Sequence, residues 1–77
     1  MGLLSLYGKG LQGKFVKLGT LKGRTQSEIV ASVGKPNSIS AAAGGKRLVQ
    51  WITPGYHIAL LFDADGVCEG VTHEFKT

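Results

Sequence analysis

The chain has 77 residues, of which 43% are hydrophobic and 18% charged, and it contains one cysteine. A chain of this length supports one modest core, which excludes a two-domain enzyme and a complete dinucleotide-binding sheet. A single cysteine excludes an internal disulfide, and no apolar run reaches the length of a membrane span.

The net charge of +4 comes entirely from the N-terminal third of the sequence, because residues 1–27 carry five basic side chains and no acidic one. Residues 1–24 form a basic, glycine-rich segment. Since each glycine inside a helix costs about 1 kcal/mol relative to alanine, we expect irregular structure or a short edge strand here, with extended pieces at residues 3–7 and 14–18. Such a segment is either a solvated basic face or a weak binding site for nucleic acid or an anionic membrane.

Residues 25–33 are predicted to form a short helix. Thr25 and Glu28 have the spacing of a capping box, in which each side chain bonds the other residue's backbone N–H. Ile29, Val30 and Val33 then form one apolar stripe. Gly34 is expected to end the helix in a left-handed conformation, and Pro36 prevents the helix from resuming.

Strands are predicted at residues 40–43, 46–53, 56–62 and 67–75, separated by turns at residues 44–45, 54–55 and 65–66. The expected fold class is α+β, a two-layer domain in which the short capped helix packs on a three- to four-stranded antiparallel sheet. Residues 25–77 make up this domain, and residues 1–24 precede it as a separate segment.

The register of the last hairpin decides which residues share a face of the sheet. A two-residue turn at residues 65–66 would place Ile58, Leu60 and Phe62 beside Val67, Val71 and Phe75. It would also place His57 opposite Glu74 on the other face. A three-residue loop with a bulge would shift the pairing by one residue. We favour the first arrangement because it gathers more large apolar side chains.

Three motifs are weighed for chemistry, and none is complete. Residues 8–14 match the spacing of phosphate-binding loops, but Phe15 stands where a magnesium-binding hydroxyl is needed. Residues 63–66 resemble the start of a calcium loop, but Val67 occupies the position of the next ligand, so a β-turn is favoured. His57, His73 and Cys68 lack the spacing of a zinc site. We therefore predict no catalytic residue, no metal and no cofactor.

Arg47, Trp51 and Tyr56 are the candidate partner-binding residues. Trp, Tyr and Arg dominate binding hot spots. Trp51 and Tyr56 lie on either side of the turn at residues 54–55, and Arg47 lies on the same strand face as Val49 and Trp51. The alternative interpretation is that Trp51 covers the small core beneath the helix.

The stretch from about residue 23 to residue 75 resembles the SmpA/OmlA type of small lipoprotein domain and the repeat unit of β-lactamase-inhibitor proteins. The matching pieces are GRTQSEIV (23–30), VGKP (33–36), GKRLVQW (45–51) and LFDADGV (61–67). The resemblance implies a helical layer on an antiparallel sheet and a role in protein–protein contact without catalysis.

Together, these observations lead us to expect a non-enzymatic module that binds another protein. The alternative is a domain whose basic N-terminal segment binds nucleic acid or phospholipid. Without a signal peptide or lipobox in the sequence, the expected location is the cytoplasm, or the cell envelope if a leader was removed.

Overall fold

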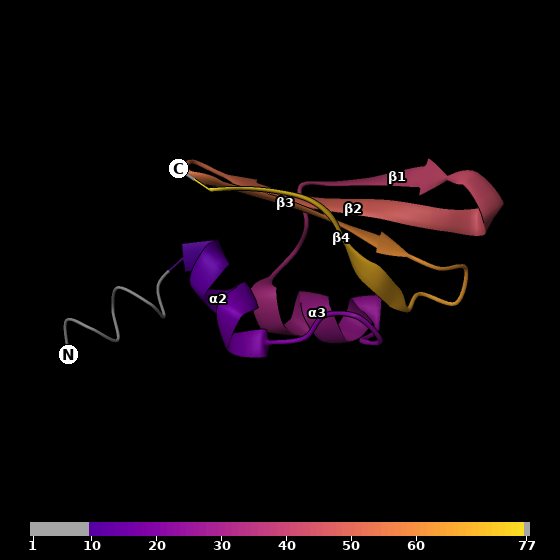
Figure 1. Ribbon diagram of the computed structural model, residues 1–77, viewed down its shortest axis with the longest axis horizontal. Coiled ribbons are helices and arrows are strands. Elements are labelled where there is room, and N and C mark those ends of the chain that lie inside the picture. Colours follow the sequence, from indigo (N-terminus) through magenta and orange to yellow (C-terminus); the bar gives the residue numbers. More distant parts are fainter. Residues whose placement is uncertain (1–9, 77) are drawn as a thin grey trace.

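Two helices precede four antiparallel strands in the computed structural model, which describes residues 10–76 (Figure 1). The elements are α2 (Gly10–Leu18), α3 (Gln26–Val33), β1 (Ser38–Ala42), β2 (Lys46–Thr53), β3 (Tyr56–Phe62) and β4 (Cys68–Lys76), with a short 3-10 turn η1 (Ala43–Gly45) between β1 and β2. The strands lie in chain order, β1-β2-β3-β4. The predicted α+β class with an antiparallel sheet is confirmed.

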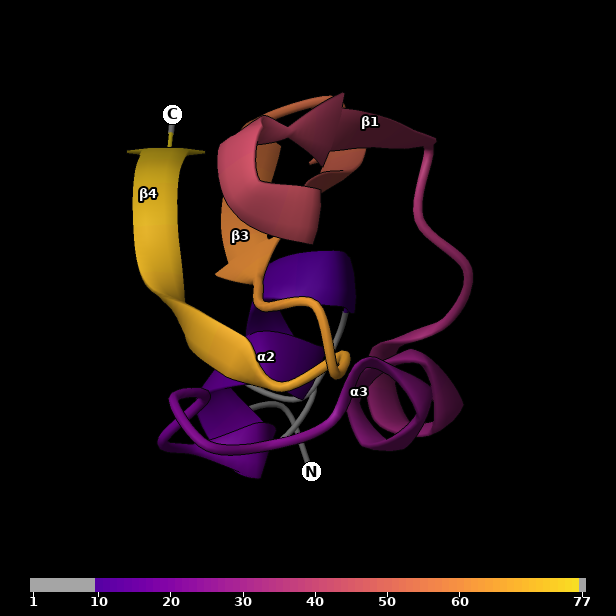
Figure 2. The ribbon, with the colours of Figure 1, turned by 90° about the vertical axis from the view of Figure 1, so that its right-hand side faces the viewer.

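Both helices lie on the same side of the sheet, as Figures 1 and 2 show from two directions. We call this side the helix face and the opposite side the open face. The core lies between the helices and the helix face, and consists of Phe15, Ile29, Val33, Val49, Trp51, Tyr56, Ile58, Leu60, Phe62 and Cys68. Among residues 10–76, no helix is long and apolar enough to cross a membrane.

Helix α2 corrects the prediction of irregular or extended structure for residues 14–18. Its residues Leu11, Phe15 and Leu18 have the i, i+4, i+7 spacing of one helix face, and all three contact the core. This burial outweighs the helix cost of Gly13, which is itself buried. The predicted extended piece at residues 3–7 lies outside the described residues.

Described residues on both sides of the predicted boundary after residue 24 contact the same core. Phe15 of α2 is buried in the same core as Ile29 of α3, and Leu21 packs against that core. Described residues 10–24 are therefore part of the domain.

Helix α3 begins after Thr25, whose hydroxyl accepts a bond from the Glu28 N–H while the Glu28 carboxylate accepts one from the Thr25 N–H. The helix ends at Gly34, which donates its N–H to the Val30 carbonyl. Gly34 has a φ of 101° and a ψ of 176°, so it has the positive φ that glycine permits without the left-handed helical conformation that we expected.

The pairing of β3 with β4 differs from the favoured register. His57 lies opposite Phe75, and Glu74 lies opposite Ile58, with register shifts between Ala59 and Leu60 and between Leu61 and Phe62. The physical reason is that Val67 pairs with Thr25 in an isolated bridge and therefore lies outside the β3–β4 ladder. Two β-bulges absorb the resulting offset.

Candidate functional site

The open face presents alternate residues of the three strands β2, β3 and β4, whose other side chains lie on the helix face. The strand register groups them in three rows across the sheet. These rows are Ile52–His57–Phe75, Gln50–Ala59–His73 and Leu48–Leu61–Gly70.

Within residues 10–76, nothing packs over the large apolar side chains of the open face. Phe75 is 60% exposed and Ile52 is 47% exposed. In the middle row Ala59 is buried, and in the third row Leu48 and Leu61 are half-buried. The apolar area is thus continuous across three strands, whereas on the helix face Trp51, Ile58 and Leu60 are buried in the core with α2 and α3.

Two histidines and Phe75 form an aromatic cluster on this face. The ring centroids of His73 and Phe75 are 4.4 Å apart, and those of His57 and His73 are 5.1 Å apart, both in edge-on arrangements. His57 Nε2 lies 2.9 Å from the Gln50 amide oxygen. Because that oxygen can only accept, Nε2 carries the proton in this hydrogen bond. The bond fixes the orientation of the His57 ring.

The open face has almost no free charge. Lys46 and Glu69 lie at one end of it and form an ion pair with each other, with a 2.9 Å distance between Lys46 Nζ and Glu69 Oε1. The three rows contain no Asp, Glu, Lys or Arg. A neutral surface of this kind is typical of the central part of a protein interface, where charged residues are depleted.

Two of the predicted partner-binding residues lie in the core. Trp51 is 1% exposed and donates its indole N–H to the Gly34 carbonyl at 2.9 Å, with the Phe15 ring edge-on at 5.3 Å. Tyr56 is 6% exposed and donates its hydroxyl to the Glu74 carboxylate at 2.6 Å. The structure thus places both side chains in the core, as the alternative interpretation gave for Trp51.

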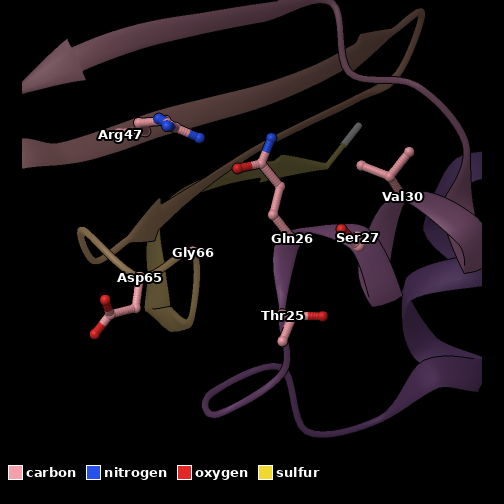
Figure 3. Close-up of a pocket in the computed structure, with 7 residues that line it drawn as sticks. All are labelled: Thr25, Gln26, Ser27, Val30, Arg47, Asp65 and Gly66. Atoms are coloured by element: carbon pink, nitrogen blue, oxygen red, sulfur yellow. The ribbon is translucent and has the colours of Figure 1, made fainter.

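Arg47, the third of these residues, is exposed on the helix face, apart from the open face. It borders a shallow open hollow of about 590 Å³ between β2 and the start of α3, where the Gln26 and Arg47 side chains point toward one another (Figure 3). The hollow is lined by Thr25, Gln26, Ser27, Val30, Arg47, Asp65 and Gly66. No polar side chain is buried within residues 10–76, so none in this hollow is held in a fixed, dry orientation for a small ligand.

Cys68 and the two histidines lie on opposite faces of the sheet. Cys68 is buried in the core, whereas His57 and His73 are on the open face. Burial raises the pKa of the Cys68 thiol, which disfavours the thiolate that nucleophilic catalysis needs. Across residues 10–76 there is no group of three or more potential metal ligands.

Asp63 bonds its own turn rather than forming an open cation loop. Its carboxylate Oδ1 accepts the N–H groups of Asp65 and Val67, each at 2.9 Å. This is the self-bonded turn that the sequence favoured over a calcium loop.

Comparisons of this chain with models of protein families, with curated proteins and with solved structures found no match.

Proposed function

We propose that this chain is a non-enzymatic interaction domain, of the SmpA/OmlA or β-lactamase-inhibitor type, that binds another protein through the open face. The observation that carries the proposal is the neutral, apolar open face on a chain whose net charge is +4. Exposed apolar patches of this kind mark interaction sites on small proteins. The helical layer on one side of the sheet agrees with what the resemblance implies and supports the proposal.

Phe75 and Ile52 are the residues expected to contribute most to such binding. A phenylalanine side chain buries about 150–250 Å² when fully covered, so covering the 60% of Phe75 that is exposed removes roughly 100 Å² from water. At about 25 cal/mol per Å², this contributes about 2.5 kcal/mol. Ile52 lies two strands away in the same row and extends the contact.

The test uses two open-face variants, Phe75→Asp and Ile52→Asp, and the matched control Val16→Asp. Val16 is 67% exposed on α2, so the control introduces the same charge at an exposed apolar residue elsewhere. Tagged full-length chains are expressed in the native cells, and co-purifying proteins are identified. A true partner should be recovered with the wild type and Val16→Asp and lost with both open-face variants.

Binding is then measured with the purified partner, where each open-face substitution should weaken affinity by about tenfold or more. Circular dichroism must show that all three variants are folded. If every co-purifying protein is recovered equally with folded Phe75→Asp and folded Ile52→Asp, the open face is not an interaction site.

A second candidate function is weak binding of nucleic acid or phospholipid by the basic N-terminal segment. The observation that favours it is that Lys14 and Lys17 are exposed one turn apart on α2 beside a second hollow, which Leu18 and Ser32 also border. Because Leu11, Phe15 and Leu18 of α2 contact the core, this helix has no free apolar face to insert into a membrane. Attraction would therefore be electrostatic and sensitive to salt.

A further inference from the structure

The two edge strands of the sheet differ in how they are protected against pairing with another strand. Strand β4 carries Glu69, Glu74 and Lys76, and two β-bulges interrupt its pairing with β3. Charges and bulges of this kind are the usual protection of an edge. Strand β1 has the sequence SISAA, with no charge, no proline and no bulge in its pairing with β2. Its first four residues are exposed.

The hydrogen bonds of β2 show which backbone groups of β1 point away from β2. The Gln50 carbonyl accepts the Asn37 N–H, and the Ile52 N–H is donated to the Asn37 side chain, so the backbone groups of Gln50 and Ile52 point toward β1. Ser38 lies opposite Gln50, and hydrogen-bonded pairs alternate with unbonded pairs along antiparallel strands. The N–H and C=O groups of Ile39 and Ala41 therefore point away from the sheet.

We propose that β1 pairs with β1 of a second copy of this chain, in antiparallel register about a two-fold axis at Ser40. In this register Ile39 lies opposite Ala41 of the second copy, and the outward N–H and C=O groups of both residues exchange four hydrogen bonds across the axis. Ser40 then faces Ser40 of the second copy as a close, unbonded pair on the open face.

A second copy suits this edge because the strand is complementary to itself. An interface of this symmetry must bring the same patch together from both subunits. Strand β1 does so without placing like charges opposite each other, and its serine and alanine side chains let two backbones approach. Ile39, which is 53% exposed on the helix face, gains apolar contact with Ala41 of the second copy.

The paired edge is small, and it therefore implies a weak dimer. Two five-residue strands bury less than the roughly 1,200–2,000 Å² of a stable specific interface. We expect a dissociation constant of about 0.1–1 mM, near the weak end of specific association. The dimer joins the two open faces in one continuous eight-stranded sheet, so a partner with two binding sites would gain avidity.

Cysteine substitution tests both the pairing and its register. In the full-length chain, Ser40→Cys places two thiols across the axis at a spacing that a disulfide can bridge. Ile39→Cys instead places each thiol opposite an alanine. Ala31→Cys, at an exposed position on α3, is the control for random collision. Cys68 is buried, and oxidation of the wild-type chain measures how much cross-linking Cys68 contributes by itself.

Under mild oxidation at about 0.5 mM protein, near the expected dissociation constant, Ser40→Cys should cross-link at least about tenfold faster than Ile39→Cys or Ala31→Cys. Equal rates for the three variants would overturn the proposal. Faster linking of Ile39→Cys would overturn the register about Ser40.

A non-covalent measurement covers the case in which oxidation perturbs the chain. Sedimentation of the wild type between 20 µM and about 1 mM should show a rising average mass, which Ser40→Lys should lower and Ala31→Lys should leave unchanged. A wild type that stays monomeric throughout would refute self-association. Phe75→Asp should not alter the cross-linking of Ser40→Cys, so failure here is distinguishable from failure of the proposed function.

Discussion

Trp51 offers the sharpest test of the core that the two helices form with the sheet. The substitution Trp51→Phe removes the indole N–H bond to the Gly34 carbonyl and leaves a cavity beside Phe15. Because Gly34 is exposed, water can replace the lost donor, which limits the hydrogen-bond loss to about 1 kcal/mol. The missing part of the ring costs about another 1 kcal/mol in burial and packing.

The expected total loss of about 2 kcal/mol is large for this domain. At 0.05–0.15 kcal/mol per residue, a 77-residue chain has roughly 4–12 kcal/mol of stability. Trp51→Ala should cost about 3–5 kcal/mol and leave a substantial unfolded fraction if the wild type lies at the low end of this range.

Urea denaturation followed by far-ultraviolet circular dichroism measures these losses without relying on tryptophan fluorescence. With a slope of about 1 kcal/mol per molar urea, Trp51→Phe should lower the midpoint by about 2 M. The control is Ile52→Ala, the next residue on β2, which is 47% exposed on the open face and should cost less than about 1 kcal/mol. A Trp51→Phe midpoint equal to that of the wild type would refute the position of Trp51 in the core.

Local sequence signals were sufficient for α3, β2 and β3. The Thr25–Glu28 spacing, the Pro54–Gly55 turn and the dense apolar pattern of residues 56–62 each act over a few neighbouring residues. Helix α2 could not be predicted in the same way, because its glycines oppose a helix locally. Its stability comes from burying Phe15 against Trp51 and Tyr56, residues more than thirty positions away in the sequence.

The register of the last hairpin was also decided by a distant segment. Val67 pairs with Thr25, and the Cys68 N–H and C=O bond the Arg24 carbonyl and the Gly23 N–H, respectively. These contacts join residues about forty positions apart. Counting apolar residues within the hairpin could not reveal them, so the arrangement with the larger apolar set was wrong.

The candidate site could not be predicted for the same reason, because it depends on which face of the sheet α2 covers. Both faces of β2 and β3 carry apolar residues, so composition alone did not show which face would be covered. Packing of α2 and α3 against Trp51 and Tyr56 buried two of the predicted hot-spot residues and left Ile52 and Phe75 exposed. The sequence signal that bears on the open face is the small number of helical residues, which are too few to cover both faces of the sheet.

Two further predictions follow from buried and exposed side chains. Burial, together with the hydrogen bond to Glu74 and its charge, raises the pKa of Tyr56 above its ordinary value near 10. The folded protein thus keeps this proton at pH values where the unfolded chain loses it, so stability is fully present below about pH 10 and falls as the pH rises further. Between pH 8 and pH 11, the urea midpoint should fall less for Tyr56→Phe than for the wild type. An equal fall for the two proteins would contradict the buried hydroxyl. The last prediction concerns the anionic-surface alternative, in which each lysine–phosphate contact contributes about −0.9 to the slope of log affinity against log salt. If Lys14 and Lys17 both contact duplex DNA, replacing both by alanine should make that slope shallower by up to about 1.8, whereas the control pair Lys35→Ala and Lys76→Ala should leave it unchanged. Fluorescent DNA and anionic vesicles are titrated at low and high salt, because attraction between exposed charges is strongest at low salt. Equal binding by the two double variants, or no binding below about 100 µM at low salt, would show that the basic side chains of α2 are only a solvated surface.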